Sequence, residues 1–312
     1  MTEFNWSRLL KWSSKYIEDS YSNQEIRQID PERLEFLQGA VREAMKDVVD
    51  PNKLISEVKE NLSLSNDEEV LASLVVIDRC IELPDCALNF EKLGIIQPIL
   101  SCLSRSEEIR CITYQILSKS MQNNLPLQIS FGKIGALQIL IERVQQECSE
   151  STKSKGITAI STLIRHNKAL ECSFISDDGL YLIISWLQSE HKCVREKALS
   201  LLRHLISEEI VTGRHIAEIN NYQIIDAIIS ISRNNSLSTT KYQDIQYSEI
   251  ISETLFQLIK VCDSKLSKVP KDKVLEEINR RILFLTEYRK TFPDDDISPE
   301  YSTLVLCREL LV

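Results

Sequence analysis

Cysteine, histidine and carboxylate side chains are the groups in this sequence that could do chemistry. The nine cysteines are scattered and form no Cys-x-x-Cys pair, which favours buried thiols over a disulfide framework or a zinc site. The four histidines are scattered too, and they lack metal-ligand spacing beside a cysteine or glutamate cluster: His166, His191, His204 and His215. We therefore expect no bound metal and no cofactor.

Motifs for phosphate binding and nucleophilic catalysis are also absent from the sequence. It contains no G-x-x-x-x-G-K-[ST], no G-x-G-x-x-G and no G-x-S-x-G. Asp294, Asp295 and Asp296 could bind a hard cation, but they lack the spaced ligands and the glycine of an EF-hand loop, so we expect a solvated loop. The other carboxylates fall on periodic helical segments, where solvated faces are common. The protein is therefore not expected to be an enzyme.

The overall charge and hydropathy narrow the class of partner. The formal net charge is −9 over 312 residues, whereas a nucleic-acid-binding protein usually carries a basic stripe. The segment Met1–Trp6 lacks the basic and then apolar run of a signal peptide. No uncharged stretch approaches the roughly 18 apolar residues of a membrane span. We expect a soluble monomer in the cytoplasm, with the nucleus as a second compartment, that binds neither nucleic acid nor membrane.

A repeat of about 42 residues organises the chain. Gly94, Gly135 and Gly179 each follow an apolar residue by four positions and precede an apolar helix, and Asn221 falls where the next turn is due. Asparagine tolerates the left-handed conformation that a glycine supplies at a helix end. Each unit is therefore predicted to contain a short helix, a turn at the glycine or asparagine, a second helix and a long third helix.

Apolar residues at three- and four-residue steps mark these helices. The predicted third helices are 70–83, 109–122, 155–165, 194–207 and 249–261. The predicted second helices are 95–103, 136–144, 180–187 and 222–231. Since one unit cannot bury both faces, stacked units must share a continuous core. The period and the glycine resemble the armadillo pattern, so we expect an all-α, right-handed superhelical solenoid.

Four segments follow from this pattern. Residues 1–30 are predicted to be a mobile arm with a short amphipathic helix, and 31–68 to be capping helices. About four repeats are predicted over 69–262. The remaining 263–312 are expected to form C-terminal caps, with helices at 271–290 and 299–311, and a loop is expected near 234–241.

In an armadillo solenoid the third helices line the concave groove, so function is sought there. Nuclear-import receptors of this fold hold basic peptides with Trp/Asn pairs, and the equivalent pairs here are Val75/Arg79, Gln115/Lys119, Thr158/Thr162 and Ser200/His204. None is a Trp/Asn pair, which argues against that mechanism. The groove also carries basic residues that suit an acidic protein surface, unless they are ordinary solvated charges: Arg79, Lys119, Arg165, Arg195 and Arg203.

Several ordered segments resemble the armadillo-type nucleotide-exchange factors of the seventy-kilodalton heat-shock chaperones. The opening 6–13 resembles that family's Leu-Leu-x-Trp-Ser start, and 84–90 resembles its Asp-Asn-Ala segment, with Cys86 in place of the asparagine. Three further segments resemble the ends and faces of its long helices: 122–124, 159–165 and 194–202. The match spans about 6–207 and weakens beyond it.

This resemblance implies a co-chaperone that clasps the chaperone's ATPase domain with its concave face and promotes release of ADP and then of client. It places chaperone contacts at Ala87, as a small close-approach position, and at Arg195, as a bidentate donor. Asn123, Asn124 and Arg165 are further candidates, with capping and inter-repeat hydrogen bonding as their alternative role. The alternative function is a generic armadillo scaffold for another protein.

Some members of that family use an N-terminal arm to compete with unfolded client. The resemblance therefore implies a client-mimicking role for the opening segment, carried by Trp6, Leu9, Leu10 and Trp12. A helix packed on the first repeat is the other interpretation of this segment.

Overall fold

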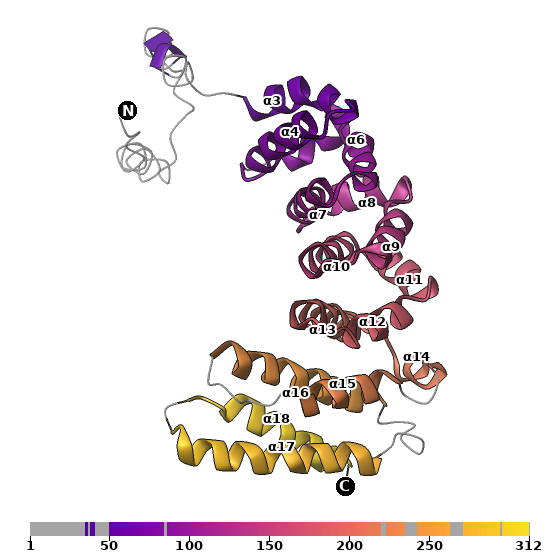
Figure 1. Cartoon of the computed structure of the whole chain (residues 1–312), viewed down its shortest axis with the longest axis vertical. Helices are drawn as coiled ribbons and strands as arrows, with labels where there is room; N and C mark the ends of the chain where they lie inside the picture. The colour runs from indigo at the N-terminus through magenta and orange to yellow at the C-terminus, as the bar shows by residue number, and fades with distance from the viewer. Residues whose placement is uncertain are drawn as a thin grey trace, which may run out of the picture. The chain divides into compact units, whose positions relative to one another are not determined.

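The computed structural model describes residues 35–36, 38–40, 50–83, 86–219, 223–234, 242–262, 271–293 and 295–311. Every regular element in these ranges is a helix, which confirms the all-α prediction (Figure 1). The chain divides into two compact units, Met1–Asp50 and Pro51–Val312, and all the helices named below belong to the second. Across the described ranges, no helix is both long enough and apolar enough to cross a membrane.

The five long third helices are present where the apolar periodicity predicts them. They are α4 (Asp67–Cys80), α7 (Glu107–Met121), α10 (Glu150–Ile164), α13 (Lys192–Ser207) and α16 (Tyr242–Cys262). All five begin earlier than predicted; the first turns of α4, α7, α10 and α13 are mainly polar, whereas α16 gains two turns that include the buried Ile245 and Tyr247. Glu107 and Glu108, for example, open α7, where acidic groups are favoured by the helix dipole but give no apolar signal.

Shorter helices complete each repeat. The second helices are α6 (Ile96–Ser101), α9 (Ala136–Gln146), α12 (Gly179–Leu187) and α15 (Gln223–Asn234). The first helices are α5 (Phe90–Leu93), α8 (Leu125–Lys133), α11 (Lys168–Ser176) and α14 (Gly213–Glu218). The chain also forms α3 (Pro51–Val58) and the 3-10 turns η2 (Lys59–Ser63), η3 (Ala87–Asn89) and η4 (Cys102–Ser104).

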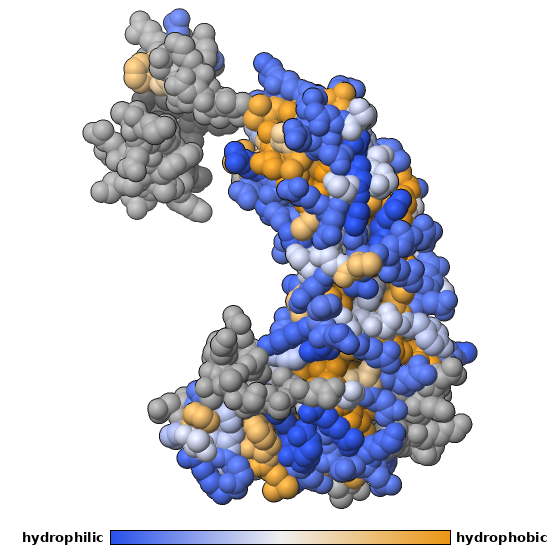
Figure 2. Space-filling view, viewed as in Figure 1, coloured by the Kyte–Doolittle hydropathy of each residue, from blue (hydrophilic) through white to orange (hydrophobic). Residues whose placement is uncertain are grey.

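Within the second unit the third helices stack along the inner side of a curve, and α9, α11 and α12 lie on the outer side (Figure 1). The buried apolar residues of this unit join into one cluster that extends from Ile55 to Leu311. Its surface in Figure 2 is mostly hydrophilic, with apolar patches that include a broad one over α3 and α4. Because the third helices stack along the inner side of the curve, they form its surface together (Figure 1).

Two of the predicted turn residues have the expected backbone, and one does not. Gly94 and Gly135 adopt left-handed φ angles of 64° and 75°. At the third turn the prediction is wrong, because Asp178 takes the left-handed conformation (φ 61°) and Gly179 is the first residue of α12. Gly179 is required for another reason, since a Cβ there would lie 2.3 Å from the Phe174 carbonyl oxygen. The predicted turn at Asn221 lies outside the described residues.

The C-terminal helices are fastened to the last repeat by a buried ion pair. The predicted helices correspond to α17 (Lys271–Thr291) and α18 (Ser298–Leu311). Arg281 Nε donates to Glu300 Oε1 at 2.7 Å, and the Ser248 hydroxyl on α16 donates to the same oxygen at 2.8 Å. Arg281 and Glu300 are 2% and 1% exposed. Because buried charges are stable only when paired, this network sets the position of both helices on α16.

We predict that Gly179→Ala destabilises the protein by about 1–3 kcal/mol, because the added methyl group must displace backbone and ring atoms of Phe174. Urea unfolding followed by circular dichroism measures the change. Asp178→Gly is the matched control, and it should be neutral or stabilising because it relieves a left-handed non-glycine residue. Equal destabilisation by both substitutions would contradict this assignment of the turn.

Candidate functional site

The candidate site is the inner face, defined as the surface that α4, α7, α10, α13 and α16 present on the inner side of the curve (Figure 1). Neighbouring third helices run parallel, because residues one repeat apart touch at both ends of the helices. Thr152 Oγ1 donates to Glu107 Oε1 at 3.2 Å near the starts of α10 and α7. Lys119 Nζ donates to Glu82 Oε1 at 3.1 Å near the ends of α7 and α4. Equivalent positions of successive repeats therefore lie side by side.

A ladder of polar contacts crosses the inner face between successive helices. Asp78 Oδ2 on α4 accepts hydrogen bonds from Gln115 Nε2 and Lys119 Nζ on α7, both at 3.0 Å. Lys119 Nζ also donates to Glu82 at 3.1 Å. Partial burial acts to lower the pKa of Lys119, but the bonds to these two carboxylates outweigh it, so the pKa is raised. Lys119 is therefore charged and is held between two acidic groups.

Most of the other basic residues predicted in the groove also bond to a neighbouring helix. Arg203 forms an ion pair with Glu253 on α16. Arg165 bonds to Ser200 and Arg195 to Tyr247, so each contacts another helix. The side chain of Arg79 has no hydrogen-bond or ion-pair partner within the ranges that the structure describes, and it is exposed. The inner face is consequently a polar surface with most of its cations paired, rather than a free basic patch.

Two of the predicted contact residues line one hollow of about 310 Å³ between α7, α10 and α13. Asn123 and Arg165 contribute to its wall, together with Thr162, Lys197 and Ser200. Arg165 Nε donates to the Ser161 hydroxyl at 2.8 Å, and Nη2 also reaches the Ser200 hydroxyl at 3.0 Å. Burial lowers the pKa of Arg165 while Glu171 opposes the shift. This hollow offers amide, hydroxyl and guanidinium groups to a partner.

Asn124 is a structural residue by its contacts. It is 7% exposed, and its Oδ1 accepts from the Leu127 N–H at 3.3 Å, which caps the start of α8. Its Nδ2 donates to the Ser120 carbonyl oxygen at 3.1 Å. These bonds match the capping role that the sequence analysis gave as the alternative to chaperone contact. Its neighbour Asn123 is exposed and has a left-handed φ of 55°.

Ala87 begins the 3-10 turn η3 that follows α4, and it packs half-buried against the core. Leu83 and Leu88 beside it are 50% and 51% exposed. The preceding residue, Cys86, is 1% exposed and belongs to the core. A small residue between two exposed leucines is compatible with close approach of a partner.

Arg195 lies apart from the other four predicted contact residues. It is in the first turn of α13, whereas Ala87, Asn123, Asn124 and Arg165 follow or end α4, α7 and α10. Its Nε donates to the Tyr247 hydroxyl at 3.0 Å, and Nη1 donates at 2.7 Å to the carbonyl oxygens of Ser189 and Glu190. It lines a different hollow, of about 600 Å³, between α12, α13 and α15.

The environment of Tyr247 shows how Arg195 is held. Tyr247 is 2% exposed. Burial raises the pKa of its hydroxyl, and the hydrogen bond from Arg195 opposes that shift. Nη2 of Arg195 has no hydrogen-bond partner in the described part of the chain. The guanidinium is thus fixed on one side and retains a donor for another molecule.

A second turn in each repeat is missed by the sequence reasoning. Asn123, His166 and Glu209 follow α7, α10 and α13, and all three have left-handed φ angles, of 55°, 60° and 58°. They are spaced by 43 residues. The asparagine after the first two, Asn124 or Asn167, caps the next helix. The asparagine repeated at this spacing, Asn124 and Asn167, was the sequence signal that could have located this turn.

The arm residues Trp6, Leu9, Leu10 and Trp12 lie outside the described residues.

Comparison with solved structures defines the fold class. A designed armadillo repeat protein superposes with a TM-score of 0.58 at 11% identity, covering 83% of this chain and 100% of that one. Another designed armadillo repeat protein, in complex with the peptide (KR)4, gives a TM-score of 0.59 at 12% identity over 81% of this chain and 99% of that one. At such identities the likeness concerns the fold alone, and it confirms the armadillo-like solenoid.

Comparison of sequences defines the family. Residues 86–281 match the SIL1/FES1/HPBP1 C-terminal domain, and the chain belongs to this family. The Hsp70 nucleotide exchange factor FES1 of Eremothecium gossypii is 25% identical over 233 residues, which cover 70% of this chain and 76% of the relative. FES1 of Kluyveromyces lactis is 26% identical over 71% of this chain and 77% of its own length. Nucleotide exchange factor SIL1 of Rattus norvegicus is 25% identical over 154 residues, which cover 49% of this chain and 33% of the relative.

We predict that Asn124→Ala lowers the free energy of unfolding by about 1–2 kcal/mol, since it removes a buried helix cap. Thermal or urea denaturation measures this loss. Asn123→Gly should leave stability nearly unchanged, because glycine adopts the left-handed angle freely. If Asn124→Ala were as stable as the wild type, the capping role would be wrong and the residue would be available for contact.

Proposed function

We propose that this protein is a nucleotide exchange factor that binds the ATPase domain of an Hsp70 chaperone as a monomer and accelerates release of ADP. The observation that carries the proposal is the family match over 86–281, which includes α7, α10, α13 and α16 of the inner face. The printed names of the relatives, Hsp70 nucleotide exchange factor and nucleotide exchange factor, support it. The role needs no catalytic group on this chain, because the nucleotide is bound by the chaperone.

The size of the inner face supports a clasp of this kind. Five helices packed about 9 Å apart extend over about 35 Å. The first four have 14 to 16 residues and are about 20 Å long, and α16, with 21 residues, is longer. The inner face therefore offers about 700 Å², close to the roughly 800 Å² that each partner contributes to a standard interface. A folded domain held in a curve of this size is in contact with several repeats at once.

The chemistry of the face favours a folded partner over an extended basic peptide. The described third helices carry no tryptophan, and Arg165 in the hollow is held by the Ser161 and Ser200 hydroxyls. Such a surface can complement polar groups of a preformed domain with little loss of side-chain entropy. Ala87, Asn123 and Arg165 would contact the chaperone along one edge and Arg195 along the other, while Asn124 would support Asn123 from below.

The energetic requirement is reciprocal coupling. A factor that weakens ADP binding a thousandfold is itself bound a thousandfold more weakly by the ADP-loaded chaperone, which corresponds to about 4 kcal/mol. The exchange factor must therefore prefer a conformation of the ATPase domain that binds nucleotide poorly. A rigid curved face can impose such a preference, because its helices are locked together by the polar ladder.

The first test is release of a fluorescent ADP analogue from an Hsp70 ATPase domain, which this protein should accelerate. Ala87→Trp should reduce that acceleration at least about tenfold, since its bulk holds the two proteins apart. Ala169→Trp is the matched control because Ala169 is exposed on α11 of the outer side. No acceleration by the wild-type protein in micromolar excess would refute the function. Equal loss in both variants would refute the site.

A second prediction separates contact from support at Arg195. Arg195→Ala should lower the exchange activity about tenfold or more, because it removes a charged donor from the interface, while the helicity stays native and the lost bond to the buried Tyr247 hydroxyl costs about 1–3 kcal/mol of stability. Tyr247→Phe keeps the guanidinium and its bonds to the Ser189 and Glu190 carbonyl oxygens and removes only the hydroxyl acceptor, so its activity should stay near that of the wild type. If the two variants lose activity equally, Arg195 acts through the packing of α13 on α16.

A further inference from the structure

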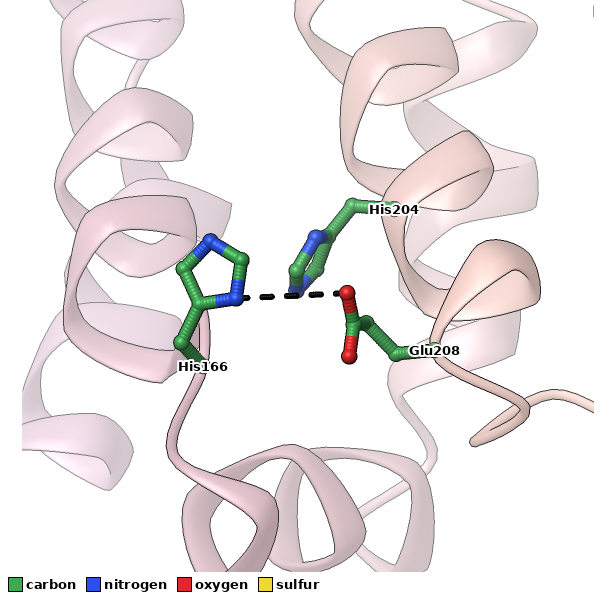
Figure 3. A group of neighbouring side chains, drawn as sticks. All are labelled: His166, His204 and Glu208. Atoms are coloured by element: carbon green, nitrogen blue, oxygen red, sulfur yellow. Dashed lines mark ion pairs between the residues drawn. The ribbon is translucent and has the colours of Figure 1, made fainter.

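Three side chains of the kinds that bind transition metals meet at the ends of α10 and α13 (Figure 3). His166 is the second residue after α10, His204 is in the last turn of α13, and Glu208 follows α13. One donor atom of each lies within 4.8 Å of the others. His166 Nδ1 is 3.9 Å from Glu208 Oε1, and the two imidazole rings are 5.1 Å apart at their centroids.

A buried carboxylate holds two of these three residues in place. Glu171 on α11 is 2% exposed, and its Oε1 lies 2.5 Å from His204 Nε2. The same oxygen accepts the backbone N–H of His166 at 3.1 Å. His204 is itself only 7% exposed, so its ring has a defined position. This bond fixes the orientation of the ring, but it engages Nε2, the nitrogen that faces His166 and Glu208 in Figure 3, so an ion bound there would replace the proton between Nε2 and Glu171.

The types of donor atom indicate which metal ions would bind. Two imidazoles and one carboxylate suit Zn²⁺ and other divalent transition metals, whereas Ca²⁺ and Mg²⁺ prefer oxygen ligands alone. Bonds of about 2.0–2.2 Å require the donors to move slightly closer together. His166 and Glu208 can make this movement, because their side chains are 66% and 45% exposed. Three protein ligands leave a fourth position of a tetrahedral ion open.

We propose that His166, His204 and Glu208 form a binding site for one divalent transition-metal ion of the Zn²⁺ class. The ion would join the ends of two neighbouring third helices and so stiffen the junction between their repeats. His166 also lines the hollow that contains Asn123 and Arg165, so the bound ion would lie at the margin of the inner face. The inference rests on the cluster alone and is independent of the proposed exchange activity.

The chain provides its own comparison for this site. In the preceding repeat the residue equivalent to His166 is Asn123, which has the same left-handed backbone and no imidazole. His191 Nδ1 lies 3.2 Å from Glu150 Oε2 at another junction, with both side chains about half exposed. Among the described residues that pair has no third donor close enough to complete a site. It is therefore a control for adventitious binding by an exposed His–Glu pair.

The experiment is titration of the full chain with Co²⁺, followed by displacement with Zn²⁺ against a chromophoric chelator. The wild-type protein should bind one ion and show visible d–d bands without a thiolate-to-cobalt charge-transfer band. This spectrum distinguishes the proposed site from the nine cysteines. Zn²⁺ should also raise the melting temperature, because it binds the folded state.

Variants then assign the ligands. His166→Asn, which retains a residue tolerant of the left-handed angle, and Glu208→Gln should each lower the affinity by more than about 100-fold, since loss of even an outer-sphere partner costs about 10- to 100-fold. His191→Ala should bind as the wild type does. The proposal is overturned if wild-type protein shows no cobalt spectrum in large metal excess, if a thiolate band appears, or if His166→Asn binds unchanged with native helicity.

Discussion

The inability of one repeat to bury its own apolar faces is the constraint on which the rest of this structure depends. α7, α10 and α13 are covered on both sides by neighbouring third helices, whereas α4 packs between α3 and α7 and α16 between α13 and α18, so the core continues from repeat to repeat. The packing is close enough to exclude a Cβ at Gly156 on α10, where it would lie 2.4 Å from Val144 Cγ2 and 3.3 Å from Tyr114 Cζ. Parallel stacking at this distance places residues one period apart in direct contact.

The polar ladder of the inner face is a consequence of that stacking. Asp78 and Lys119 are 41 residues apart in the chain, and Lys155 Nζ reaches Cys111 Sγ at 3.1 Å across 44 residues. These bonds use groups that a solvated helix would leave free, so the face is polar yet largely satisfied. A partner would meet an ordered surface and would not have to immobilise flexible lysines and arginines, which reduces the entropic cost of binding.

The junction between α10, α11 and α13 combines several of these effects. Glu171 is buried there and binds both the His166 backbone and the His204 ring, so one carboxylate couples three elements. A buried carboxyl group of this kind is tolerated only because its hydrogen bonds are made. The same junction carries Arg165 and its bonds to Ser200. The local rigidity of the inner face and the clustering of potential metal ligands therefore have a common origin.

The sequence by itself determined the helical class, the period of about 42 residues and the approximate position of each third helix, because apolar spacing and turn residues are local properties. It also carried the family resemblance, since that depends on ordered motifs. It misplaced the third turn, where Asp178 and not Gly179 is left-handed, because a glycine signal does not distinguish a φ requirement from a steric one.

Only the tertiary structure decided which predicted contacts lie together. It separates Arg195 from Asn123 and Arg165, buries Asn124 in a helix cap, and joins His166, His204 and Glu208 into one cluster. None of this follows from spacing along the chain. Contacts between repeats depend on the phase of one helix against the next, and that phase is set by side-chain packing rather than by any residue's local preference.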